Sequence, residues 1–321
     1  MKNIVLSILI SGLLILGLTG CSVFDLVKKF TDPVEKAEIL NWKSVHAKVF
    51  VNEAKREDYE GKWYLYMGEV YSISDEYCQL GSLTPIKSYL DKEVLKELNK
   101  GDKIVVVGKL EDMISDPKLT DALKLDKKTV EEKLVMAEVR TTGIARNITY
   151  DDYKVDPKTH KITSYRSSGT SNSIHKCKYN RKGKIEEEII EYTLSSYGMD
   201  KINYTYNKDD KVKTERHRKI KDGKTTEDNT WKYTYDEKDS KGRTLKKTAL
   251  NPKTNYKMVY TYEYDDEDNI IKETQSSSNG TYAIEYEYDE YGNRIKETSY
   301  NVLKPYYKAN TTHEYDIVGK K

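Results

Sequence analysis

Tyrosine is the residue whose type and spacing point most clearly to chemistry in this chain. The chain has 321 residues and 28 tyrosines, and most of the tyrosines lie after residue 149. Four Tyr-x-Tyr pairs recur there, and both rings of a pair share one face because strand side chains alternate between faces. Such a ladder either packs the sheet or, where it is open, offers a surface for sugar rings or a partner strand. The eight members of this possible binding surface are Tyr204, Tyr206, Tyr233, Tyr235, Tyr262, Tyr264, Tyr286 and Tyr288.

Cys21 is the second candidate for chemistry. It follows the apolar run Ile4–Leu18, which is shorter than the roughly 20 residues that a membrane-spanning helix needs and has the flanks of a signal peptide. The sequence Leu-Thr-Gly-Cys at 18–21 resembles the lipobox of bacterial lipoproteins. This resemblance implies transfer of diacylglycerol to the Cys21 thiol, cleavage before it, and anchoring by acyl chains such as palmitate on the extracytoplasmic face of the cell membrane. The alternative is an ordinary signal peptide with an incidental cysteine.

Other reactive residues are too sparse to predict a metal, a cofactor or catalysis. His175-x-Cys177 supplies two of the four ligands that zinc prefers. The acidic turn 265–269 lacks the glycine and bidentate glutamate of an EF-hand and is expected to be a solvated turn. No nucleophile, phosphate-loop or metalloprotease motif is present, so we expect no enzyme. A disulfide between Cys78 and Cys177 stays open as an alternative, and it would join two domains.

The elements that position these residues fall into two halves with different aromatic usage. The three phenylalanines, Phe24, Phe30 and Phe50, all precede residue 150, whereas the second half is rich in tyrosine. Tyrosine without phenylalanine indicates a thin sheet whose rings keep a wet hydroxyl. The formal net charge is +2, and neither half is strongly basic, so we expect no nucleic-acid partner.

Residues 41–148 are expected to form a small β-barrel. A helix is expected over Asn41–Glu57, although the β-branched run at 49–51 makes a strand the alternative. Strand patterns at 61–74, 77–83 and 84–89 precede a helix at 91–100 and a strand at 103–110, which is the element order of an OB-fold. We expect a second helix at 118–133 and a closing strand at 134–145. Gly68 and Gly108, inside two of the strands, indicate bulges or barrel bends.

This half resembles the tRNA-anti-like OB domains of bacterial lipoproteins. The resemblance is carried by Asn52-Glu53-Ala54, Tyr59-x-Gly61-Lys62, Gly68-x-Val70, Gly101-Asp102-Lys103 and Val107-Gly108-Lys109. The family name suggests nucleic acid, and Tyr64, Tyr66 and Tyr71 are candidates for base stacking. We do not carry that function over, because the domain is slightly acidic and expected to be extracytoplasmic.

Residues 149–321 repeat a hairpin. An aromatic residue followed by Asp or Asn recurs at intervals of 24 to 29 residues, and each copy continues into a turn and an aliphatic residue. The anchors are Tyr179, Tyr206, Tyr235, Tyr264, Tyr288 and Tyr315, with a degenerate copy at Val155-Asp156. The unit Tyr288-Asp289-x-Tyr291-Gly292-Asn293-Arg294-Ile295 resembles the YD repeats of Rhs-type surface proteins. In that family the hairpins form shells around toxic cargo. This array is too short to enclose a cargo domain, so we expect an open, curled antiparallel sheet.

Together these patterns predict a mostly β chain. The expected parts are a signal peptide at 1–20, a lipidated tether at 21–40, an OB-fold-like domain at 41–148 and a YD-type hairpin domain at 149–321. The leading functional hypothesis is a non-catalytic envelope lipoprotein that binds cell-wall glycan or a surface protein. The alternatives are a spacer or assembly component that pairs through sheet edges, and a relative of Rhs-type toxin shells.

Overall fold

The computed structural model describes residues 32–40, 45, 55–81, 85–113, 116–144, 146–169, 172–194 and 197–321. The signal peptide, Cys21 and most of the helix expected over Asn41–Glu57 lie outside these residues. The chain divides into two compact units, Met1–Lys133 and Leu134–Lys321. Both are dominated by strands, which agrees with the expected fold class. Within the described residues, no helix is long and apolar enough to cross a membrane.

The first unit is a small OB-like barrel. Its strands run in the order β2-β3-β4-β6-β5, and β5 pairs back onto β2. The β4–β6 pairing is parallel, and helix α5 comes between the third and fourth barrel strands, as expected of an OB-like barrel. The elements are α3 (Pro33–Lys36), β1 (Glu38–Ile39), η1 (Arg56–Asp58), β2 (Trp63–Ile73), β3 (Cys78–Leu80), β4 (Ile86–Ser88), α5 (Lys92–Glu97), β5 (Lys103–Glu111), β6 (Lys118–Lys124) and α6 (Lys127–Lys133).

Glycines let the strands of this barrel approach closely. A Cβ built on Gly68 would lie 2.9 Å from the Leu80 Cβ, and one on Gly108 would lie 2.9 Å from the Leu119 Cβ. The strand register shifts across Gly108, between Val107 and Lys109, whereas in β2 it shifts between Val70 and Ser72, two residues beyond Gly68. The predicted bulge is therefore confirmed at Gly108. The barrel encloses a core that includes Val106 and Leu110, which are fully buried.

Two expectations about the end of this barrel are wrong. Lys118–Lys124, expected as helix, is the fifth barrel strand, β6, and only Lys127–Lys133 is helical. The strand Leu134–Gly143 (β7), expected to close the small barrel, pairs instead with β20 and β8 of the second unit. Tertiary pairing decided both cases, because β6 fills the barrel gap between β4 and β5 that β7 was expected to fill.

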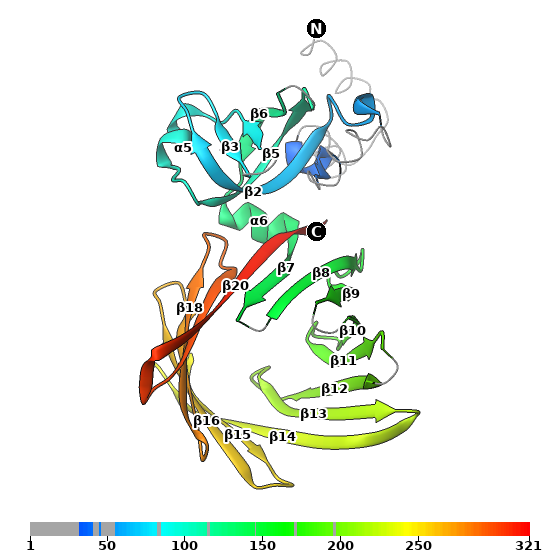
Figure 1. Cartoon of the computed structure of the whole chain (residues 1–321), viewed down its shortest axis with the longest axis vertical. Helices are drawn as coiled ribbons and strands as arrows, with labels where there is room; N and C mark the ends of the chain where they lie inside the picture. The colour runs from blue at the N-terminus through cyan, green and yellow to red at the C-terminus, as the bar shows by residue number, and fades with distance from the viewer. Residues whose placement is uncertain are drawn as a thin grey trace, which may run out of the picture. The chain divides into compact units, whose positions relative to one another are not determined.

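The second unit is a ring of fourteen antiparallel strands that closes on itself. Figure 1 shows its strands following one another from green β7 to red β20, which returns beside β7. The expected open sheet is therefore wrong. Its strands are β7 (Leu134–Gly143), β8 (Arg146–Val155), β9 (Ile162–Ser168), β10 (Ser173–Tyr179), β11 (Ile185–Tyr192), β12 (Met199–Tyr206), β13 (Val212–Lys221), β14 (Lys224–Lys238), β15 (Thr244–Asn251), β16 (Tyr256–Tyr264), β17 (Ile270–Ser277), β18 (Gly280–Tyr288), β19 (Arg294–Asn301) and β20 (Lys304–Lys320).

The repeated Asp or Asn builds the hairpin turns at one end of the strands. In these turns its side-chain oxygen accepts hydrogen bonds from backbone N–H groups two or four residues on, as Asp289 does from Tyr291 and Asn293. The fourth turn residue has a positive φ, which is +80° at Gly292 and +68° at Asp268. This is a type I turn followed by a left-handed residue. The capping residues of these turns are Asn180, Asn207, Asp239, Asp265 and Asp289. Asp156 caps a turn that is one residue longer, in which the positive φ falls at His160.

One turn is capped by a residue that does not directly follow its anchor tyrosine. Asp236 follows the anchor Tyr235, but Asp239 caps that turn. Two register shifts in β14 after Tyr235 account for the difference, because they add residues before the turn.

Candidate functional site

The anchor tyrosines form a hydrogen-bonded ladder from repeat to repeat. The hydroxyls of five anchors each donate to the backbone carbonyl of a residue at the start of the second strand in the preceding hairpin. Tyr264 donates to the Thr244 carbonyl at 2.7 Å, and Tyr288 donates to the Ile270 carbonyl at 2.7 Å. Tyr179, Tyr206 and Tyr235 make the equivalent bonds to the carbonyls of Ile162, Ile185 and Val212. These anchor tyrosines therefore join neighbouring hairpins, which is a structural role.

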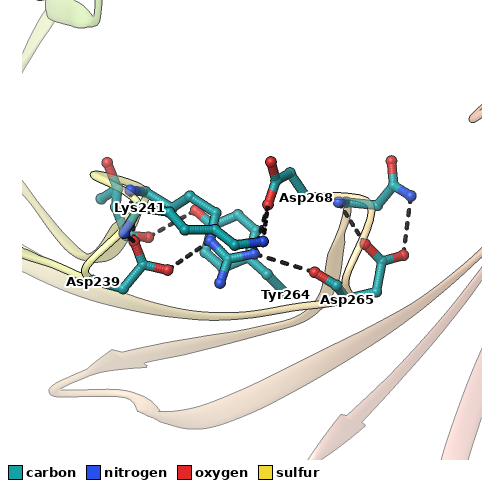
Figure 2. A network of polar contacts seen from close by, with 8 residues as sticks. Asp239, Lys241, Tyr264, Asp265 and Asp268 are labelled. Carbon is teal, nitrogen blue, oxygen red and sulfur yellow. Dashed lines mark hydrogen bonds and ion pairs between the residues drawn. The ribbon is translucent and has the colours of Figure 1, made fainter.

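Charged side chains join the same turns (Figure 2). The Arg243 Nε lies 2.6 Å from Asp239 of its own turn, and its Nη1 lies 2.8 Å from Asp268 of the next turn. The Arg243 guanidinium also covers the Tyr264 ring at 4.7 Å. Lys241 reaches Asp268 at 3.3 Å. Successive turns are thus held at a fixed spacing by ion pairs and a cation–π contact.

The other tyrosine of each pair lies on the same face but outside the ladder. We call Tyr204, Tyr233, Tyr262 and Tyr286 the upstream tyrosines, because each precedes its anchor by two residues. All eight paired tyrosines are half-buried. In β16 the tyrosine face alternates with the exposed residues Lys257, Thr261 and Glu263. In a closed barrel the less exposed face of a strand points inward, so the upstream tyrosines line the lumen.

The surroundings of Lys247 show that side chains from several strands meet on this inner face. Its Nζ lies 4.2 Å from the ring centroid of Tyr260 and 5.4 Å from that of Tyr233. Glu215 and Glu273, from strands on either side, both influence it electrostatically. Side chains from five consecutive strands approach one another in this way only on a concave face. Burial lowers the pKa of Lys247, although the two glutamates oppose that shift.

The inner face is polar and partly desolvated. Burial is the main cause that raises the pKa of Tyr233, and nearby Glu215 adds to it while accepting the Tyr233 hydroxyl at 2.9 Å. Burial likewise raises the pKa of Tyr262, with Glu273 adding to it. Barrels of eight strands are filled by side chains, whereas those of sixteen or more leave an aqueous interior. A ring of fourteen strands is close to the larger size, and a lining of tyrosine and glutamate suits an interior that contains water.

The sequence did not reveal one Ser–His–Glu arrangement on this face. The Ser173 Oγ lies 3.1 Å from the His175 Nε2, and the His175 Nδ1 lies 3.1 Å from the Glu188 Oε1. The serine is only 3% exposed, and its Oγ also bonds the Ser167 Oγ at 2.7 Å. The adjoining backbone belongs to paired strands, and ladder-bonded amides do not form an oxyanion hole. We interpret the arrangement as a polar packing network.

The other residues considered in the sequence are the acidic turn, the two cysteines and the tyrosines of the small barrel. Among the described residues, no group of three or more His, Cys, Asp or Glu side chains could hold a metal ion. In the acidic turn, Asp265 binds the backbone and side chain of Asn269. Cys78 and Cys177 are free thiols in different units. In the small barrel Tyr64 is buried and Tyr71 is exposed, so the three candidate tyrosines do not form one stacking surface.

Comparison with known proteins adds little beyond this geometry. The chain matches no protein-family model and no curated protein. It resembles a porin-like protein from Bacteroides vulgatus at 12% identity and a TM-score of 0.33, covering 55% of this chain and 97% of that one. A porin-like protein from Bacteroides uniformis is 11% identical with a TM-score of 0.31, and the match covers 78% of this chain and 95% of that one. The TcdB2-TccC3-Cdc42 structure is 10% identical with a TM-score of 0.25, and the match covers 75% of this chain and 16% of that one. These TM-scores are too low to carry any argument about this chain.

Proposed function

We propose that this protein is a non-catalytic binding protein of the cell envelope that takes up glycan on the inner face of its hairpin ring. The observation that carries the proposal is the row of upstream tyrosines. Their rings are half-buried, lie outside the anchor ladder and alternate with carboxylates such as Glu215 and Glu273. Aromatic faces that stack on sugar rings, beside groups that bind hydroxyls, are suited to carbohydrate.

The envelope location rests on the sequence. The expected lipid anchor at Cys21 would hold the chain at the membrane on the extracytoplasmic side, where cell-wall glycan is available. Glycan is therefore favoured over nucleic acid as the ligand. A surface protein is the alternative partner, and the test below separates the two.

The spacer hypothesis loses its main physical support. It required exposed sheet edges that could pair with another chain. In the closed ring each of the fourteen strands has two neighbours, so this sheet offers no free edge. The anchor ladder explains the regularity of the repeats without any role in assembly.

The test measures tyrosine accessibility by solvent-perturbation absorbance on the purified protein, with and without a neutral N-acetylglucosamine oligosaccharide. We expect the sugar to protect several tyrosines, and calorimetry to report binding. Tyr262→Leu removes one upstream ring and is expected to weaken binding roughly fivefold, given about 1 kcal/mol for an aromatic contact.

The matched control is Tyr306→Leu, because Tyr306 is 72% exposed at a hairpin tip outside the paired tyrosines. It should leave sugar binding unchanged. If no tyrosine is protected and no heat of binding is detected, the glycan proposal fails and a protein partner becomes the next candidate.

A further inference from the structure

A polar pocket of about 440 Å³ lies at the seam where the ring closes. Its lining comes from β7, β18, β19, β20 and the turn between β18 and β19. The Glu138 and His313 side chains that meet there are 175 residues apart in the chain. We call this the seam pocket. It is lined by Glu138, Tyr288, Gly292, Asn293, Arg294, Glu297, His313 and Tyr315.

The seam pocket lies where the repeat departs from its own pattern. The position paired with the anchor is aliphatic in three earlier hairpins, as Ile270 is opposite Tyr264. In the bulged pair of β14 and β15, Lys247 lies opposite Tyr235 instead. Opposite Tyr288 the same position holds Arg294. Within the described residues Tyr315 makes no ladder bond like those of the other anchors. A charged residue at a repeated aliphatic position brings chemistry that the fold does not require.

The polar atoms of the pocket are oriented but not fully used. The Arg294 Nη1 lies 3.0 Å from the Glu297 Oε1, and its guanidinium lies 3.9 Å from the centroid of the Tyr286 ring. The His313 Nδ1 lies 2.7 Å from the Glu138 Oε1. The Arg294 Nε and the His313 Nε2 are buried and have no hydrogen-bond partner. The His313 Nε2 is 3.7 Å from Glu297, which is too far for a hydrogen bond.

These free positions define the chemistry of a ligand. The Arg294 Nε–H can only donate, so it needs an oxygen acceptor. When the His313 Nδ1–H is donated to Glu138, the Nε2 accepts, so it needs a hydroxyl donor. Hydroxyl groups both donate and accept, and neighbouring hydroxyls of a sugar meet both needs while the Tyr288 and Tyr315 rings offer apolar faces. Glu138 and Glu297 would repel an acidic ligand.

We infer that the seam pocket binds one neutral sugar residue, with Arg294 and His313 holding its hydroxyls. This inference rests on the proposed glycan-binding function and adds one subsite to it, next to the upstream tyrosine Tyr286, whose ring Arg294 contacts. The pocket volume lies within the range of small-molecule sites.

The test is the substitution Arg294→Ile, which introduces the aliphatic type of residue found at this position in three earlier hairpins. We expect binding of a neutral N-acetylglucosamine oligosaccharide to weaken at least tenfold by calorimetry, while the thermal midpoint stays the same or rises. Glu297→Gln preserves the side-chain size but removes the charge that holds Arg294 in place, so it should also weaken binding. This second variant keeps the test decisive if Arg294→Ile fails to fold. Arg243→Gln is the matched control, because Arg243 lies in a turn outside the pocket, and it should bind as the parent does.

Each outcome has a separate meaning. If the parent binds and both pocket variants bind equally well, the seam pocket is not the site, although the proposed function stands. If an acidic oligogalacturonate binds as tightly as the neutral sugar, the ligand class is wrong. If the parent binds neither sugar, the proposed function fails together with this inference.

Discussion

At the scale of single residues, tyrosine has two roles in this protein, and the position in the repeat decides which one. Anchor tyrosines such as Tyr264 donate a hydrogen bond to the preceding hairpin. Upstream tyrosines such as Tyr262 present their rings to the lumen. Both are half-buried, so exposure alone does not separate them. The hydroxyl of an anchor is therefore structural, whereas an upstream tyrosine lies on the same face without joining the ladder.

Removing one anchor hydroxyl tests this division. We expect Tyr264→Phe to lower the free energy of unfolding by about 1 kcal/mol, because the Thr244 carbonyl loses its donor. The measurement is urea denaturation followed by circular dichroism. Tyr262→Phe is the control, and it should change stability less because its hydroxyl is outside the ladder. Equal losses in the two variants would contradict the ladder.

The anchors could be predicted from the sequence, but the seam pocket could not. The Tyr-Asp spacing and the turn residues are local patterns, so the repeat reveals them directly. Arg294 and Glu138 are far apart in the chain, and only closure of the ring brings them to one pocket. The available signal was Arg294 itself, which occupies a position that is aliphatic in most other copies.

At the scale of elements, the turns hold the hairpins in register. Gly242 has a φ of +80°, and a Cβ built there would meet nothing within 4 Å. Gly242→Ala should therefore cost about 1 kcal/mol through backbone conformation alone. Urea denaturation checks this value. Lys241→Ala in the same turn is the control, and it should cost less because surface ion pairs contribute little. A stability gain in Gly242→Ala would contradict the turn geometry.

The buried tyrosines on the inner faces of the strands make the stability of the folded state depend on pH in the alkaline range. Burial is the main cause that raises the pKa of Tyr315 from 10.0 to about 12, and the nearby Glu138 adds to it. Burial likewise raises the pKa of Tyr192 to about 12. The folded state therefore favours the neutral phenol. This stabilisation is complete below pH 10 and is lost as the pH rises from 10 through 12.

Alkaline titration measures the effect. We expect one group of tyrosines to ionise near pH 10, and the inner group to ionise only at higher pH, together with loss of the circular dichroism signal. Tyrosinate absorbance and circular dichroism are recorded on the same samples. A single transition near pH 10 with an unchanged fold would show that the inner face is open to solvent.

The sequence-based prediction of elements was wrong where strand pairing, and not the local residue pattern, determined the structure. Lys118–Lys124 carries polar residues that are compatible with a helix, yet it forms β6 because β4 and β5 leave a place for a fifth strand. Leu134–Gly143 was identified as a strand, but sequence could not show which sheet it joins. Hairpins with local turn signals had no such ambiguity.

At the scale of the whole molecule, closure of the ring creates both the lumen and the seam pocket. It depends on β7, which precedes the repeats, and β20, the last strand of the chain. Thr142 and Thr312 face each other across this junction and are both exposed. Side chains directly opposite on antiparallel strands have Cβ atoms about 4.5–5.5 Å apart, which a disulfide can bridge after little adjustment.

The most direct test is therefore a disulfide across the seam. We expect Thr142→Cys combined with Thr312→Cys to form an intramolecular disulfide under mild oxidation, detected by mass spectrometry of the digested monomer. Thr142→Cys with Thr261→Cys is the control, because β7 and β16 lie five strands apart around the ring, about 24 Å at ordinary strand spacing. Crosslinking of the first pair alone supports the closed ring. Failure of that pair to crosslink in the folded protein would mean an open sheet, and the account of the lumen and the seam pocket would be wrong.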